Sequence, residues 1–180
     1  MEAPDEQLML AYRDGDAGAF ETLYARHRGA LYRFVLRSLK GTASDRAIAE
    51  ELFQEAWIRV IEARERYAPS AKFTTWLYTI AHNLLVDHWR KKGLALVSLE
   101  TDDVPVESAN PARRAEGRES LARFLGALEA LPPAQRETFL LHEEAGLSVA
   151  EIAAATGSSE EAAKSRLRYA MAKLKSAVDE

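Results

Sequence analysis

The chain has 180 residues, a hydrophobic share of 47% and no cysteine. This length suits one large domain or two small ones, and the apolar share excludes wholesale disorder. The missing cysteines exclude a disulfide framework and a thiolate metal site, and they fit a reducing cytoplasm. A net charge of −4 argues against tight binding to free nucleic acid, although the distribution of charge matters more than the sum.

The first thirty residues lack the basic start and apolar run of a signal peptide. No stretch approaches the roughly 18 consecutive apolar residues of a membrane span. We therefore predict a cytoplasmic protein without membrane insertion.

Apolar residues recur at helical spacing through most of residues 1–93. The pattern predicts helices over residues 5–13, 16–39, 45–67 and 72–91, with glycines at 41 and 93 as terminators. No segment alternates for long enough to form a sheet. The expected fold class is all-α.

Residues 94–117 hold several acidic residues, two prolines and Asn110, with few large apolar residues, which predicts a flexible acidic linker. Helical periodicity resumes near Arg118, and Pro132-Pro133 starts a further helix. We therefore predict two small helical domains, 1–93 and 118–180, joined by the linker 94–117.

Residues 147–158 indicate a helix-turn-helix. Two capping boxes, Ser148 with Glu151 and Ser158 with Glu161, mark two helix starts, and Gly157 makes the turn between them. On the second helix one stripe is apolar and is expected to face the core: Ala163, Leu167, Ala170, Leu174 and Val178.

The rest of that second helix is basic, with five Lys or Arg and no acid between residues 164 and 175. Such a helix can enter the major groove of DNA, with its first turns on base edges and its later cations on phosphates. The alternative is an ordinary solvated helix.

The helix predicted over 72–91 carries two separate stripes. One is expected to face the core: Phe73, Leu77, Ile80, Ala81, Leu84 and His88. The other combines an aromatic ring, an amide and cations, which suits single-stranded DNA: Lys72, Trp76, Thr79, Asn83, Asp87 and Arg90, continued by Lys91 and Lys92. The alternative is that Trp76 is half-buried against a neighbouring helix. His82 and His88 are six apart and share no face, so no metal site is expected.

On the helix predicted over 45–67, a polar face with one apolar residue lies apart from the expected core residues Ile48, Leu52, Phe53, Ala56, Val60 and Ile61. The polar face consists of Glu51, Gln54, Glu55 and Ile58. It could bind a basic partner helix or be plain surface.

Taken in order, five segments resemble motifs of the extracytoplasmic-function branch of the sigma-70 family of RNA polymerase sigma factors. They are 51–57 (ELFQEAW), 73–83 (FTTWLYTIAHN), 87–91 (DHWRK), 131–137 (LPPAQRE) and 163–167 (AKSRL). The resemblance covers roughly residues 8–176. Acidic Glu160 and Glu161 depart from the usual pattern at the head of the last helix, so its base preference stays open.

The resemblance implies a transcription initiation factor that binds core RNA polymerase and promoter DNA, with an anti-sigma factor as a further partner, and without cofactor, metal or enzymatic activity. It places Glu51, Gln54, Glu55 and Ile58 on polymerase. The −10 element would be opened and read by the loop 68–72 and the following helix: Pro69, Ser70, Lys72, Trp76, Thr79, Asn83, Asp87, Arg90, Lys91 and Lys92. The −35 element would be read by Ser159, Glu161, Lys164, Ser165, Arg166, Arg168 and Lys173.

Three other classes fit less well. A response regulator would need an α/β receiver domain, whereas residues 1–92 predict only helices. A helical protein that mimics a sigma-factor surface would not need the Trp76 stripe and the basic helix together. An enzyme would need a phosphate-binding loop, a catalytic triad or paired carboxylates, and the sequence has none of these arrangements.

Overall fold

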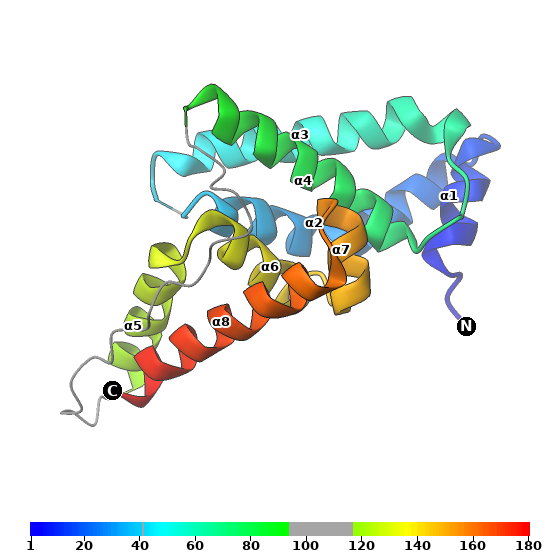
Figure 1. The fold of residues 1–180 in the computed structure, drawn as a ribbon. Coiled ribbons are helices and arrows are strands. Elements are labelled where there is room, and N and C mark those ends of the chain that lie inside the picture. Colours follow the sequence, from blue (N-terminus) through cyan, green and yellow to red (C-terminus); the bar gives the residue numbers. More distant parts are fainter. Residues whose placement is uncertain (41, 94–116) are drawn as a thin grey trace.

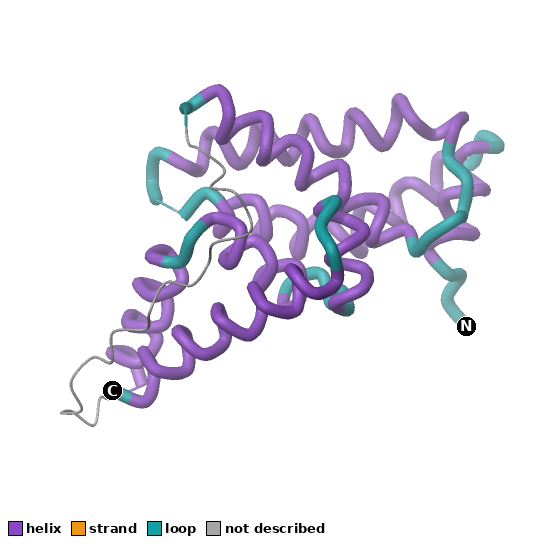
Figure 2. Tube along the Cα trace, viewed as in Figure 1, coloured by secondary structure: helices purple, strands orange, loops and turns teal. Residues whose placement is uncertain are grey.

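A computed structural model describes residues 1–40, 42–93 and 117–180 of the chain. Within these residues every regular element is helical, and Figure 2 shows helices joined by short loops. None of the helices in the described part is both long and apolar enough to cross a bilayer. The predicted all-α class is confirmed.

The N-terminal half contains α1 (Asp5–Arg13), α2 (Ala17–Ser38), α3 (Asp45–Ala63), the 3-10 helix η1 (Arg64–Arg66) and α4 (Phe73–Lys91). The start of α2 is set by Asp16, whose carboxylate accepts the N–H of Ala19 at 3.3 Å. Helices α2, α3 and α4 pack on one another, and α1 lies across α2 (Figure 1). The helix predicted to reach residue 67 changes to 3-10 geometry after Ala63, and the other bounds match to within one residue.

The C-terminal half contains α5 (Gly117–Ala130), α6 (Pro133–Glu143), α7 (Val149–Thr156) and α8 (Glu160–Asp179). Helix α8 packs against each of the other three, as Figure 1 shows in orange and red. The predicted linker 94–117 lies outside the described residues except for Gly117, which is the first residue of α5, and Gly41 also lies outside them.

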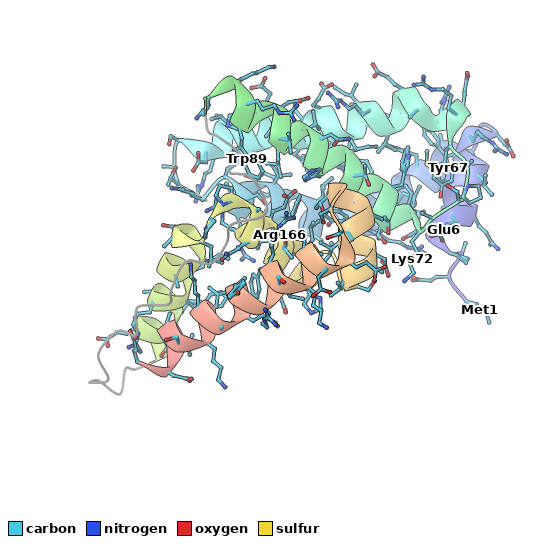
Figure 3. All side chains as sticks on the ribbon, in the orientation of Figure 1. Met1, Glu6, Tyr67, Lys72, Trp89 and Arg166 are labelled. Carbon is cyan, nitrogen blue, oxygen red and sulfur yellow. The ribbon has the colours of Figure 1, made fainter. Side chains whose placement is uncertain are left out.

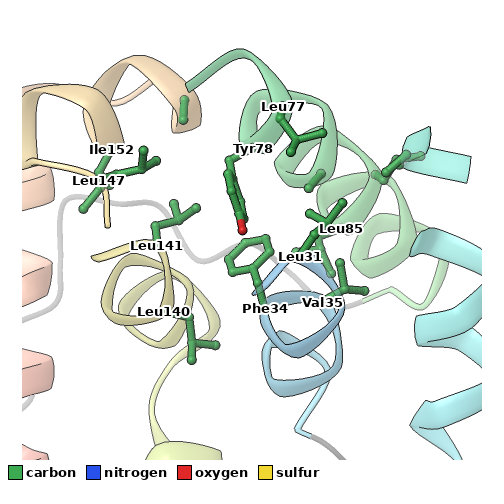
Figure 4. Close-up of a cluster of buried hydrophobic side chains, with 14 of the residues drawn as sticks. Leu31, Phe34, Val35, Leu77, Tyr78, Leu85, Leu140, Leu141, Leu147 and Ile152 are labelled. Atoms are coloured by element: carbon green, nitrogen blue, oxygen red, sulfur yellow. The ribbon is translucent and has the colours of Figure 1, made fainter. Parts of the chain in front are cut away.

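The two halves lie in contact in this structure. Helix α4 packs on α7, and α2 packs on α6. Figure 4 shows side chains from both halves in one buried cluster, where Phe34 and Tyr78 meet Leu141, Leu147 and Ile152. The core therefore runs across the boundary between the two predicted domains.

Candidate promoter- and polymerase-binding surfaces

The outer stripe of α4 is presented to solvent along most of its length. The exposed side chains are Lys72, Asn83, Asp87, Arg90, Lys91 and Lys92. Thr79 is half-buried, and its hydroxyl donates to the carbonyl of Thr75 at 2.7 Å. An amide and several cations therefore share one open face, as the sequence predicted.

Trp76 on this stripe is, like Thr79, not fully open to solvent. Its ring is half-buried, with centroid distances of 5.1 Å to Tyr67 and 5.8 Å to Phe73. The half-burial matches the alternative given for this side chain, whereas the ring partners are not on a neighbouring helix but in the loop before α4 and the first turn of α4 itself. Only part of the indole remains available to a base. Ile80 and His88, which were expected in the core, are half-buried.

The loop before α4 exposes residues 68–72 between two fixed ends. At its start Tyr67 is buried, and burial, followed by the charges of Glu6 and Asp5, raises the pKa of its hydroxyl. At its end the Glu6 carboxylate accepts the N–H of Phe73 at 2.8 Å. Figure 3 shows Glu6, Tyr67 and Lys72 at the same end of the molecule.

Glu6 is a residue that the sequence reasoning missed. Lys72 occupies the N-cap position of α4 without a capping hydrogen bond from its own side chain. Glu6, which lies 67 residues earlier on α1, supplies an acceptor and a negative charge at that helix start instead. No local sequence pattern reveals a cap from so far along the chain.

The polar face of α3 is also presented to solvent. Glu51, Gln54 and Ile58 are exposed, whereas Glu55 is half-buried and pairs with Arg59 at 3.5 Å. Ile61 was expected in the core, but 41% of it is exposed, close to the 45% of Ile58. This correction follows from helix geometry, because residues 58 and 61 are three apart and share a face. The face is therefore more apolar than predicted.

The helix-turn-helix is present, with one cap shifted. Gly157 has φ +66° and ends α7, and Ser148 caps α7 by accepting the N–H of Glu151 at 3.2 Å. The predicted Ser158 cap of α8 is wrong, because Ser159 accepts the N–H of Ala162 at 3.1 Å. Ser158 belongs to the end of α7, since its N–H donates to the carbonyl of Ala153.

The side chains of α8 and its N-cap fall into an exposed, a half-buried and a buried set. Ser159, Glu161, Lys164, Arg168 and Lys175 are exposed, and Ser165 and Lys173 are half-buried. In the predicted core stripe Ala163, Leu167, Ala170 and Leu174 are buried, whereas Val178 near the helix end is 40% exposed.

Arg166 departs from the prediction that it contacts DNA. It is only 4% exposed and lies inside the structure between α8 and the rest of the molecule (Figure 3). The reason is its register: position 166 is three residues after Ala163 and four before Ala170, so it falls on the buried stripe of α8. In this arrangement Arg166 is not available to a phosphate or base.

The described residues contain no group of three or more His, Asp or Glu side chains placed to hold a metal ion. A cleft of about 630 Å³ lies between the ends of α2 and α4 and the α5–α6 corner. Arg136 and His88 line it, and burial followed by the Lys92 charge lowers the pKa of His88.

Comparisons with known proteins identify both halves. The model of Sigma-70 region 2 matches residues 23–94, and that of Sigma-70, region 4 matches residues 121–174. The chain is 35% identical over 175 residues to the RNA polymerase sigma factor CarQ of Myxococcus xanthus, covering 96% of each. It is 34% identical to the ECF RNA polymerase sigma factor SigE of Mycolicibacterium smegmatis, over 87% of this chain and 62% of the relative.

Among solved structures, the chain is similar to the sigma factor RpoE from Bartonella quintana, solved in complex with the anti-sigma factor NepR. The TM-score is 0.66 at 27% identity, over 88% of this chain and 96% of that one. The order of the helices, the two family matches and the two relatives agree with one another. The chain belongs to the sigma-70 family of RNA polymerase sigma factors, in its extracytoplasmic-function branch.

Proposed function

We propose that this sigma factor binds bacterial core RNA polymerase and brings it to promoters by contacting the −10 and −35 elements with separate halves of the chain. The observation that carries the proposal is the open face of α4, the helix that follows the exposed loop 68–72, where Asn83 and three successive cations near the helix end are exposed. Sigma factors are regulatory proteins, so we assign polymerase the catalysis and this chain the recognition.

The −10 element is assigned to the loop and α4. A base that leaves the duplex enters beside Pro69, Ser70 and Lys72, where the exposed part of the Trp76 ring, packed on the buried Tyr67 ring, supplies an aromatic surface. The amide of Asn83, with Thr79 and Asp87 beside it, faces base edges. Arg90, Lys91 and Lys92 lie at the end of the same helix and hold phosphates.

The −35 element is assigned to α8 as duplex DNA. Lys164, Arg168 and Lys173 contact phosphates, and Ser159, Glu161 and Ser165 lie at the helix start, where a major-groove helix meets base edges. A glutamate there accepts from the amino group of cytosine. Arg166 is left out of this set because it is buried.

Core polymerase is assigned to the α3 face. Glu51, Gln54 and Glu55 lie on the turns just before the exposed Ile58 and Ile61, so the face offers a small apolar patch beside acidic and amide side chains. Such a face fits a basic partner helix with apolar residues of its own. The net charge of −4 fits this division, because polymerase then supplies most of the affinity for DNA.

An anti-sigma factor is proposed as a second partner. The support is the Bartonella quintana structure, in which a sigma factor of similar fold is bound to one. Binding of the anti-sigma factor would prevent this chain from binding polymerase. We place this interaction in the cytoplasm, where transcription takes place.

The test is binding of the purified chain to core polymerase, followed by run-off transcription from its own upstream region. Gln54→Ala with Glu55→Ala should weaken core binding at least tenfold, and Glu21→Ala, which removes an exposed acid of α2, should not. Circular dichroism shows whether each variant keeps its helices. Equal affinity for wild type and the double variant would remove the α3 assignment, and no binding by the wild type would contradict the function itself.

A further inference from the structure

Helix α1 contacts both ends of the exposed loop 68–72 (Figure 3). Its Glu6 carboxylate accepts the N–H of Phe73, just after the loop, at 2.8 Å. Its Arg13 guanidinium donates to the carbonyl of Tyr67, just before the loop, at 3.5 Å. Glu6 and Arg13 are about two helical turns apart, so they share one side of α1. A helix outside the loop therefore fixes where both ends of the loop lie.

Helix α1 is itself held firmly on the rest of the N-terminal half. Its inner face carries Met9, which is fully buried, and Tyr12, which is 7% exposed. At its first residue the Asp5 carboxylate accepts a hydrogen bond from Arg26 at 3.0 Å and lies 2.8 Å from the ring nitrogen Nε2 of His27. Both partners belong to α2, so α2 determines the position of Glu6 without help from the loop.

The loop has little internal structure that could fix its own shape. Its side chains are all exposed, and one backbone hydrogen bond is described inside it, from the N–H of Ser70 to the carbonyl of Ala68 at 2.8 Å. Lys72, the N-cap of α4, provides no capping hydrogen bond from its side chain. Such a segment samples many conformations unless its ends are held. Glu6 holds one end, because it satisfies a free N–H at the start of α4 and adds a negative charge there.

The first turn of α4 carries the aromatic surface that lies beside the loop. Phe73 is fully buried, and its ring centroid is 5.8 Å from that of Trp76. The Tyr67 ring packs on the same indole at 5.1 Å. If the first turn frayed, Lys72 and the indole would move together. The hydrogen bond from Phe73 to Glu6 thus keeps the loop and the indole in one arrangement.

We propose that α1 acts as a clamp on the −10 loop and that Glu6 is its main positioning residue, acting through Phe73 and without touching DNA. A loop whose ends are already held loses less conformational entropy when it closes on a base, so the clamp strengthens the capture of single-stranded DNA. The clamp itself is a property of the free chain. Its effect on base capture rests on the proposed function.

Amide hydrogen exchange tests the clamp without polymerase or DNA. In Glu6→Ala the N–H of Phe73 loses its acceptor, so the amides of Phe73 and Trp76 should exchange at least tenfold faster than in the wild type. Amides near Leu85, in the buried middle of α4, should keep their rates. Glu6→Gln keeps an oxygen acceptor in the same place and should retain most of the protection.

The second measurement uses the full chain bound to core polymerase and a fluorescent single-stranded oligonucleotide with the −10 element of its own promoter. Glu6→Ala should weaken binding of the oligonucleotide roughly tenfold, while the affinity of the chain for core polymerase stays unchanged. Glu6→Gln should stay within about threefold of the wild type. A loss of folding would lower both affinities, so the difference between them distinguishes positioning from stability.

Glu2→Ala is the matched control in both measurements. It removes an acid of the same N-terminal segment, and this carboxylate is 90% exposed and binds Arg26 at 3.4 Å, not the loop. An exposed ion pair of this kind contributes little. Exchange at Phe73 and affinity for the oligonucleotide should therefore both match the wild type.

The outcomes separate the clamp from the proposed function. Unchanged exchange at Phe73 in Glu6→Ala, or a Glu6→Gln chain that loses as much protection as Glu6→Ala, would overturn the clamp. Faster exchange with unchanged affinity for the oligonucleotide, or equal losses of oligonucleotide and core affinity, would overturn the positioning role. If the wild type bound core polymerase but not the oligonucleotide, the proposed −10 assignment would be contradicted, and the exchange result would still establish the clamp.

Discussion

Arg136 should be the side chain with the largest single effect on stability outside the apolar core. It is 2% exposed and makes four hydrogen bonds to three carbonyl oxygens, those of Ser38, Glu129 and Leu131, at 2.9 to 3.2 Å. Burial lowers the pKa of its guanidinium. The negative charge of Glu129, followed by those of Asp45 and Glu137, acts in the opposite direction and raises it, but by less. The group is thus desolvated and is compensated mainly by these carbonyls.

Arg136→Met keeps the length of the side chain and removes the donors. Three buried carbonyls lose their partner at about 1 kcal/mol each, so the free energy of unfolding should fall by about 3 kcal/mol. In urea this corresponds to a midpoint lower by about 1.5 M. Arg118→Met, an exposed arginine at the start of α5, is the control and should change little.

Two probes resolve where the loss occurs. All three tryptophans lie in the N-terminal half, at Trp57, Trp76 and Trp89, so fluorescence follows that half, while circular dichroism follows all helices. The dichroism midpoint should fall in Arg136→Met because the α5–α6 corner loses two carbonyl contacts. The fluorescence midpoint should also fall if the Ser38 contact couples the halves. A dichroism midpoint within about 0.3 M of the wild type would refute this account of Arg136.

Two smaller effects follow from local geometry. Ser159→Ala should cost about 1 kcal/mol in the free energy of unfolding, whereas Ser158→Ala should cost clearly less; a larger loss at position 158 would return the cap to that residue. For pH, burial and Lys92 lower the pKa of His88 below its usual 6.5, so the unfolded chain takes up this proton at higher pH than the folded chain does. The free energy of unfolding should therefore fall as pH drops from about 7.5 to about 5.5, and His88→Gln should weaken that fall. Urea midpoints at both pH values measure the difference. The same difference in the wild type and in the variant would speak against this role of His88.

The helices were predictable because their signals are local. Apolar spacing over 72–91 places Phe73, Leu77, Ala81 and Leu84 in the core, where all four are buried. The same spacing places Asn83 and Arg90 on the opposite side, where both are exposed. A periodic pattern reports which face of a helix is buried, and this information was sufficient for the fold class and for most of the α4 surface.

The predictions that were wrong concern residues whose type and position in the helix favour different roles. Arg166 lies in a basic run and also on the buried stripe of α8. The sequence prediction followed its charge, whereas its position on the helix places it among the buried residues. Ser158 and Ser159 are both good caps, and the glutamate three residues after Ser158 favoured the wrong one. The left-handed Gly157 decides the case, because it commits Ser158 to the end of α7.

Contacts between distant segments were beyond the sequence. Glu6 and Phe73 are 67 residues apart, and Arg136 and Ser38 are 98 apart. Neither pair belongs to a repeating pattern within one helix, and each joins elements whose relative placement only the packed structure gives. The pairs that Glu137, Glu144 and Glu151 form with the N-terminal half went unnoticed for the same reason, since these glutamates lie on separate turns and look like ordinary surface residues in the sequence.

The hydrogen bond from Phe73 to Glu6 has a practical consequence for the design of recombinant fragments. The region 2 match begins at residue 23, so a fragment cut at that boundary would lack all of α1. It would keep every promoter-facing residue proposed for α4. However, the first turn of that helix would lose the Glu6 acceptor, and the carbonyl of Tyr67 would lose its hydrogen bond from Arg13. A fragment of the N-terminal half should therefore begin no later than Glu2, whose carboxylate also binds Arg26.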